Sequence, residues 1–168
     1  MSKQKILIPL DGSTCSRQIL PEIVRYFNPA DNDLILLHVA RQPHGVLAAP
    51  AQPTAAEWPV PMYRSDQDVE RVKHPIYASQ VQDNLIAELE HEFSADQKNL
   101  KAAGFNVSVL IGFGDPARKI LNVIKDEQVN LVAMTTHGHS GLHRLIFGSV
   151  AERVLRGSSV PVLFVQNY

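Results

Sequence analysis

The sequence predicts an α/β domain in which an open, five-stranded parallel sheet carries helices on both faces. Three observations lead to this fold class. Short apolar runs alternate with longer stretches whose apolar residues recur at helical spacing. The 168 residues fit one domain and allow a substantial core without disulfides. Hydrophobic residues make up 45% of the chain and charged residues 20%, as in an ordinary globular protein, so we expect residues 1–168 to form a single domain.

A β-α-β unit opens the chain. Lys5–Leu10 is an apolar run that ends at an Asp-Gly-Ser turn, which is typical of a strand buried on both faces. Residues 14–27 have helical spacing, and Pro21 within them is expected to kink or restart the helix. Leu34–Val39 is the second buried strand. The helix between the two strands supplies the crossover that parallel pairing needs.

Residues 41–76 differ from the rest of the chain. They hold six prolines and show no periodicity, which predicts a long surface loop inserted into the domain. Trp58, Met62 and Tyr63 within it favour packing against something. A lid over a ligand, a loop held against the surface and a contact with a partner chain all remain open.

The next predicted elements are a long helix over residues 78–103 and a strand over Phe105–Ile111. Gly104 between them is a plausible C-terminal cap of the helix. Four apolar residues define one face of this helix: Val81, Leu85, Leu89 and Phe93.

A cap also marks the following helix, because Asp115 can accept hydrogen bonds from its first turn and Pro116 suits its first position. Ile120, Leu121 and Ile124 form its buried face. The remaining predicted elements are a strand over Val129–Thr135, a helix over Ser149–Arg156 and a strand over Val160–Val165.

Charge and cysteine content exclude several classes of protein. The formal net charge of −1 gives no overall attraction to nucleic acid or to an anionic membrane. Cys15 is the only cysteine, which fits a reducing compartment. The apolar stretch Ile6–Leu10 is too short for a signal-peptide core, and no apolar run approaches the ~20 residues that span a bilayer. We therefore expect a cytoplasmic protein with no nucleic-acid or membrane partner.

Two loops after strands are candidates for a ligand site, because open parallel sheets bind ligands beyond the carboxyl ends of their strands. The first loop contains Asp11, Gly12 and Ser13. Asp11 can accept hydrogen bonds from a ribose hydroxyl or an adenine amine, and Gly12 lets the backbone approach a ligand closely. Asp-Gly-Ser is also ordinary turn and helix-cap chemistry, which the residues alone favour.

The second loop runs from Thr135 through Gly138 to Gly148, Ser149 and Val150. Its second half opens a helix whose free N–H groups and positive dipole end suit a phosphate. Ser149 and Glu152 also have the spacing of a capping box, in which side chains would occupy the same N–H groups. These residues alone leave phosphate binding and a plain cap evenly balanced.

The sequence lacks the motifs of several other binding and catalytic sites. The chain has neither a P-loop nor a Gly-x-Gly-x-x-Gly run after the first strand, and no nucleophile and base can be paired. We expect no catalytic residue. His137, His139 and His143 are close in sequence, but no further ligand accompanies them, so we predict no metal site.

Together these residues resemble the universal stress protein family over nearly the whole chain. The motifs that carry the resemblance are Ile6–Ser13, Leu36–Val39, Gly112–Ala117, Met134–Val154 and Pro161–Val165. The longest of them resembles the family signature Gly-x-x-Gly, nine residues, Gly-Ser/Thr. The resemblance implies a Rossmann-like sheet of the adenine nucleotide alpha hydrolase-like type.

The resemblance also implies a function and its residues. Some members bind ATP, ADP or AMP, others bind no nucleotide, and many are homodimers paired through the last strand, here Val160–Val165. Positions matching Asp11 and Val39 contact adenosine, and Pro9 and Met134 line the pocket. The phosphates lie against Gly138, Gly148, Ser149 and Val150. The sequence leaves open whether Mg²⁺ accompanies the nucleotide.

One departure from the signature concerns its first glycine, which is Thr135 here. A β-branched side chain at this position could narrow the pocket, shift the nucleotide or abolish binding. The leading hypothesis is therefore a stress-response or signalling protein that binds an adenine nucleotide and has at most slow ATP hydrolysis. The alternative is a homodimeric interaction module of the same fold that has lost nucleotide binding.

Overall fold

The computed structural model describes residues 3–40, 75–136 and 147–166, with the backbone alone for residues 75–85. The predicted proline-rich loop therefore lies outside the described residues up to position 74. Its last two residues are not loop but the start of a long helix. Proline is accepted there because the missing N–H in the first turn has no intrahelical partner to lose.

The chain divides into two compact units. The first joins residues 1–41 to residues 89–168 and contains the whole sheet, and the second covers residues 42–88. Helix α4 (Pro75–Ala102) is continuous across the boundary, and its residues from Leu89 onward belong to the first unit. Across the described residues, no helix combines the length and the apolar character that crossing a bilayer requires.

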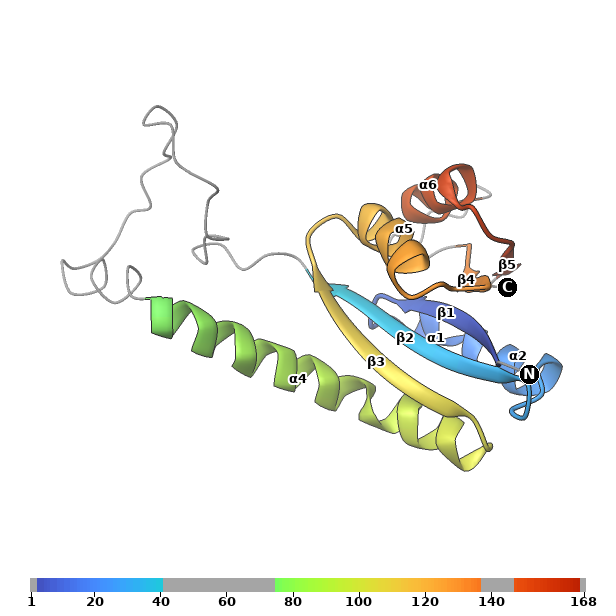
Figure 1. The fold of residues 1–168 in the computed structure, drawn as a ribbon, viewed down its shortest axis with the longest axis horizontal. Coiled ribbons are helices and arrows are strands. Elements are labelled where there is room, and N and C mark those ends of the chain that lie inside the picture. The colour runs from blue at the N-terminus through green and yellow to red at the C-terminus, as the bar shows by residue number, and fades with distance from the viewer. Residues whose placement is uncertain (1–2, 41–74, 137–146, 167–168) are drawn as a thin grey trace. The chain divides into compact units, whose positions relative to one another are not determined.

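The sheet has five parallel strands in the order β3-β2-β1-β4-β5 and confirms the predicted fold class (Figure 1). Because β1 is central, it pairs with β2 along its whole length and with β4 near its middle. The strands are β1 (Gln4–Leu10), β2 (Asn32–Ala40), β3 (Asn106–Phe113), β4 (Leu131–Thr135) and β5 (Val162–Val165).

The first helical stretch is interrupted, as predicted for a segment that contains Pro21. It forms α1 (Thr14–Arg17) and α2 (Ile19–Tyr26), and Pro21 occupies the first turn of the second helix. Gly104 follows the end of α4 with φ +96°, a left-handed conformation that favours glycine, and confirms the predicted cap. The remaining helices are α5 (Pro116–Asp126) and α6 (Ser149–Gly157).

Two strands begin two residues later than their apolar runs suggested. Val129 was predicted in β4, but its N–H donates to the Ile124 carbonyl at 3.0 Å and so completes the end of α5. Val160 was predicted in β5, but its N–H donates to Ser158 Oγ at 3.2 Å in the preceding turn. Both side chains still pack in the core. Hydrophobic periodicity therefore predicts which residues enter the core, but not at which residue the pairing with a neighbouring strand begins.

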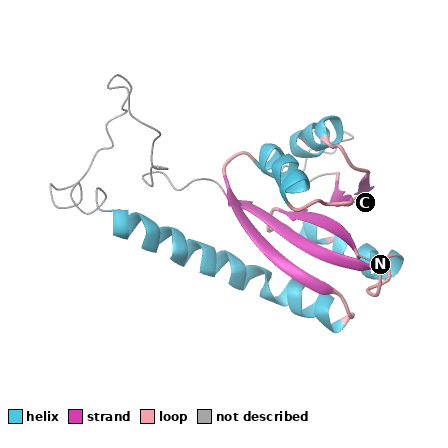
Figure 2. Ribbon diagram, viewed as in Figure 1, coloured by secondary structure: helices cyan, strands magenta, loops and turns pink. Residues whose placement is uncertain are grey.

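Helices lie on both faces of the sheet (Figure 2), and a layer of core side chains covers each face. On one face, Ile8 and its neighbours pack against α1, α2 and the end of α4, which contributes the buried Phe93. On the other face, Leu7 and its neighbours pack against α5 and α6. The alternation of Leu7 and Ile8 between layers is that of a strand buried on both faces. Val81 and Leu85, which we predicted beside Phe93, have no described side chains.

Candidate functional site

The strand order places a topological switch point between β1 and β4. From β1 the sheet continues to β2 and β3 on one side and to β4 and β5 on the other. Helices α1, α2 and α4 cover one face and α5 and α6 the other, so the loops after β1 and β4 leave toward opposite faces. A crevice outside the carboxyl ends of two such strands is where open α/β sheets bind ligands. Both candidate loops of the sequence therefore meet this edge.

The loop after β1 has the tight geometry that its Asp-Gly-Ser sequence predicts. Gly12 has φ +82°, a left-handed conformation that favours glycine. Asp11 Oδ1 accepts hydrogen bonds from the Ser13 N–H at 3.0 Å and from Ser13 Oγ at 2.6 Å. Ser13 in turn caps α1 by accepting from the Ser16 N–H at 3.0 Å. The turn and cap roles are thus both present, and Asp11 is exposed at the edge of the sheet.

The residues on either side of the loop after β4 lie close together. The Gly148 N–H donates to the Thr136 carbonyl at 2.7 Å, which fixes the start of α6 beside the end of β4. Gly138, one of the predicted phosphate contacts, lies outside the described residues, as do His137, His139 and His143. Among the described residues no cluster of histidine, cysteine, aspartate or glutamate could hold a metal ion.

The capping box that we considered for α6 is not formed. Gly148, not Ser149, is the N-cap residue, so Ser149 is already the first residue of the helix. Glu152 pairs with Arg156 at 2.8 Å one turn further on. No side chain of the described part of the chain caps this helix. The N-cap glycine has no side chain that could occupy the first-turn N–H groups, and the dipole at this end of the helix favours negative charge.

Four of the predicted site residues lie on one face of the sheet. Val39, Met134 and Val150 belong to or pack against the core layer under α5 and α6. Pro9 lies two residues after Leu7 of that layer and pairs in register with Leu37, which also belongs to it. The structure therefore brings these residues to the face on which α6 begins.

Thr135, which replaces the signature glycine, is 6% exposed at the end of β4. Its neighbour Met134 belongs to the layer under α5 and α6, whereas Ala133 belongs to the opposite layer. Strand alternation assigns the Thr135 side chain to the side of Ala133. Its register partner on β5, Val165, packs on that side too. The added side chain consequently points away from the face that carries Met134.

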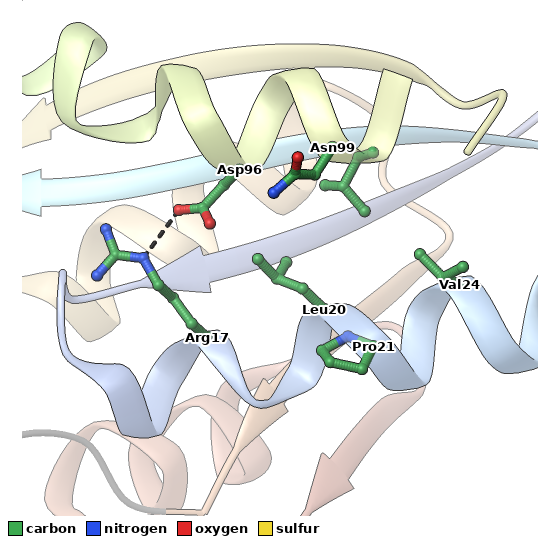
Figure 3. Close-up of a pocket in the computed structure, with 7 residues that line it drawn as sticks. Arg17, Leu20, Pro21, Val24, Asp96 and Asn99 are labelled. Atoms are coloured by element: carbon green, nitrogen blue, oxygen red, sulfur yellow. Dashed lines mark hydrogen bonds and ion pairs between the residues drawn. The ribbon is translucent and has the colours of Figure 1, made fainter. Parts of the chain in front are cut away.

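A groove between α1–α2 and α4 is separate from the predicted site. It has a volume of about 320 Å³ and holds none of the predicted ligand residues. Figure 3 shows Arg17 and Asp96 facing each other across it, joined by a hydrogen bond. Sequence reasoning missed this pair, since local spacing carries no signal for two residues on different helices.

A further acidic residue, Asp115, lies in the loop after β3, at the carboxyl ends of the strands. Asp115 caps α5 as predicted, accepting from the Arg118 N–H at 2.8 Å. Its two oxygens also accept from Arg153 of α6, at 2.7 and 3.0 Å. The hydrogen bonds from Arg153 and from the Arg118 backbone lower the pKa of Asp115 below its usual value.

This pKa shift predicts a pH-dependent contribution to stability. A carboxyl whose pKa is lowered by folding stabilises the protein above its unfolded pKa and loses that effect as the pH falls through the folded value. We expect Asp115→Asn, which can still cap α5, to lower the Tm at pH 7, with a difference that shrinks below a pH of about 4. Asp126→Asn, at the other end of α5, is the control. Thermal melts from pH 3 to pH 8 check this, and a constant difference would contradict it.

The strand order and the glycine N-cap of α6 define a doubly wound α/β protein with a helix start that is compatible with an anion. The family model for the universal stress protein family matches residues 3–166. The chain therefore belongs to the universal stress protein family, which confirms the predicted resemblance.

Relatives of known sequence agree with this assignment. The chain is 26% identical over 162 residues to universal stress protein YxiE of Bacillus subtilis, covering 96% of this chain and 98% of that protein. It is 31% identical over 91 residues to universal stress protein MJ0577 of Methanocaldococcus jannaschii, covering 54% of this chain and 56% of that protein.

Solved structures share the fold. MJ0577 superimposes with a TM-score of 0.73 at 25% identity, over 100% of this chain and 99% of that one. The universal stress protein UspA of Lactobacillus plantarum has a TM-score of 0.66 at 18% identity, covering 98% and 99% of the two chains. At that identity the second likeness concerns the fold alone.

Proposed function

We propose that this protein binds an adenine nucleotide, ATP, ADP or AMP, in the crevice between β1 and β4 and acts in a stress response or in signalling. One observation carries the proposal. The start of α6 is fixed beside the end of β4, and no described side chain caps it. Its N–H groups are therefore suited to hold a phosphate. Whether Mg²⁺ accompanies the nucleotide is a question for the same binding experiments.

Two structural neighbours support the choice of ligand class. One is a universal stress protein in complex with cAMP, with a TM-score of 0.61 at 15% identity. Another is a family member from Arabidopsis thaliana with AMP bound, also with a TM-score of 0.61, at 17% identity. Those ligands belong to those proteins. Adenine nucleotides are the ligand class that these two neighbours share, and this supports the same class for the proposed site of this chain.

The proposed roles follow the position of each residue. Asp11 and Val39 contact the adenosine part, since they follow or end the neighbouring strands β1 and β2. Pro9 and Met134 line the pocket on the face of α5 and α6. The phosphates lie against the start of α6 and the loop before it: Gly138, Gly148, Ser149 and Val150.

Thr135 does not argue against this ligand, because its side chain belongs to the opposite face of β4. We expect Thr135→Gly to leave nucleotide affinity nearly unchanged. A gain of about tenfold or more would contradict that view and show that the threonine narrows the site. Isothermal titration at 25 °C, with variant and wild type both confirmed as folded, gives the comparison.

Isothermal titration of the full chain with ATP, ADP and AMP tests the proposed function. We expect saturable binding at or below millimolar nucleotide, and no heat at millimolar ligand would contradict it. The rival function is a homodimeric interaction module without a ligand. Native mass spectrometry of gently purified protein separates the two, because copurified nucleotide favours the first and a bare dimer favours the second.

We also propose a homodimer formed through the last strand, Val160–Val165. Within this segment, residues Val162–Val165 form β5, which is an edge strand of the sheet. All four residues of β5 are half-buried. An edge strand presents unpaired backbone groups that a second copy can pair with. The mass of the native species gives the oligomeric state in the same experiment.

A further inference from the structure

Arg17, the last residue of α1, contacts both the loop after β1 and helix α4. Its Nη1 donates to the Gly12 carbonyl. Its Nε donates to Asp96 Oδ2 at 2.8 Å, and its Nη2 lies 3.3 Å from Glu92 Oε1. The guanidinium carbon lies 5.5 Å from the centroid of the Phe93 ring. One side chain thus joins the Asp-Gly-Ser loop to three residues of α4.

Phe93 connects α4 to the same loop by a second route. Its ring centroid lies 5.1 Å from that of His38, whose Nδ1 is 2.9 Å from the Leu10 carbonyl. The carbonyls on either side of Asp11 are therefore both held by side chains that contact Phe93. Phe93 itself is 1% exposed, so this contact point is fixed within the core.

The loop and α4 also leave little space between Gly12 and Glu92. A Cβ added at Gly12 would lie 3.0 Å from Glu92 Oε1. The ion pair is partly shielded from water, with 27% of the Arg17 side chain and 15% of the Asp96 side chain exposed. The hydrogen bond to Asp96 raises the pKa of Arg17 above its usual value, so the guanidinium stays charged.

We propose that Arg17 is a positioning residue for the nucleotide site. By holding the Gly12 carbonyl against α4, it fixes the turn in which Asp11 Oδ1 is bonded to Ser13, and so sets the direction of the Asp11 carboxylate. Three of its five N–H groups already donate to partners in the protein, which holds the guanidinium in this position. This inference rests on the proposed function for its effect on binding.

Nucleotide affinity tests the positioning role in the full chain. We expect Arg17→Gln to weaken ATP or AMP binding by about tenfold, because the turn loses its link to α4. Asp96→Asn weakens binding in the same direction, and adding it to Arg17→Gln has little further effect. Arg25→Gln on α2 removes an exposed arginine with the same change of charge and is the control. Wild-type affinity in Arg17→Gln would overturn the proposal.

Amide hydrogen exchange tests the same link without any nucleotide. The Ser13 N–H is bonded to Asp11 Oδ1 and so reports the position of that carboxylate. We expect Arg17→Gln to speed Ser13 exchange by about tenfold while the Gly114 N–H, bonded to the Ala40 carbonyl, is unchanged. Faster exchange at both sites would indicate general destabilisation and overturn the proposal, as would unchanged Ser13 exchange.

The two measurements separate this inference from the proposed function. If the wild type binds no nucleotide, the proposed function fails, and Ser13 exchange still decides whether Arg17 holds the turn. If the wild type binds nucleotide and Arg17→Gln binds equally well, the proposed function stands and the positioning role fails.

Discussion

Gly148→Asp is expected to abolish nucleotide binding while leaving the fold at least as stable. Gly148 is the N-cap of α6 and has extended backbone angles that an aspartate adopts without strain. An aspartate there caps the helix and places its charge at the positive dipole end, which stabilises by a few tenths to about 1 kcal/mol. The same carboxylate occupies the N–H groups proposed for phosphate and repels it, so affinity falls by more than about a hundredfold.

The opposite signs of these two effects make the prediction specific. A variant that merely misfolds loses stability together with affinity, whereas Gly148→Asp keeps its Tm or raises it. Gly148→Asn, which caps without adding charge, is the matched control and retains more affinity than the aspartate. Isothermal titration and thermal melts on the same samples give both values. Nucleotide binding by Gly148→Asp at wild-type affinity would show that the phosphate lies elsewhere.

Phe93→Ala is expected to have the largest effect on stability, lowering the free energy of unfolding by about 3–5 kcal/mol. The Phe93 side chain is 1% exposed and lies in the core layer between the sheet and α4. Truncation leaves a cavity and removes the ring that His38 and Arg17 contact. Chemical denaturation followed by circular dichroism measures the change.

Tyr26→Ala is the matched aromatic control for this experiment. Tyr26 is at the end of α2 and 67% exposed, so its truncation should change the free energy of unfolding by no more than about 0.5 kcal/mol. Equal losses for the two variants would contradict the placement of Phe93 in the core.

Where strands are buried on both faces, the sequence was enough to predict them. The run Ile6–Leu10 and the run Leu34–Leu37 are apolar without interruption because helices cover both sides of the sheet. Two helix caps could also be predicted from sequence, since Asp115 and Gly104 act within a turn of their own helices. Features decided by neighbouring residues could therefore be predicted.

Features decided by competing local partners were harder. Ser149 and Glu152 have the spacing of a capping box, but α6 begins one residue earlier and Arg156 pairs with Glu152. Glu152 has the spacing for a capping box with Ser149 and also for an ion pair with Arg156 at i+4, so spacing alone does not decide between the two. That one-residue shift is what leaves the start of α6 without a capping side chain from the described residues.

Contacts between distant segments could not be predicted at all. In the sequence, Arg17 is a polar residue near the start of the helix predicted over residues 14–27. Its partners Glu92 and Asp96 lie on α4, beyond the long proline-rich segment. Likewise, the effect of Thr135 on the proposed nucleotide site depends on which face of β4 its side chain occupies. The pairing of Thr135 with Val165 on β5 identifies that face. The candidate site could be placed from sequence, but the residues that hold its loop required the fold.

The most direct test of phosphate binding at α6 follows the amide resonances of Ser149, Val150 and Ala151 by NMR. Titration with AMP should shift these three N–H signals strongly, whereas adenosine, which lacks a phosphate, should shift them little. Saturation with AMP that leaves all three signals in place would contradict the account, because the anion would then lie somewhere other than the start of α6.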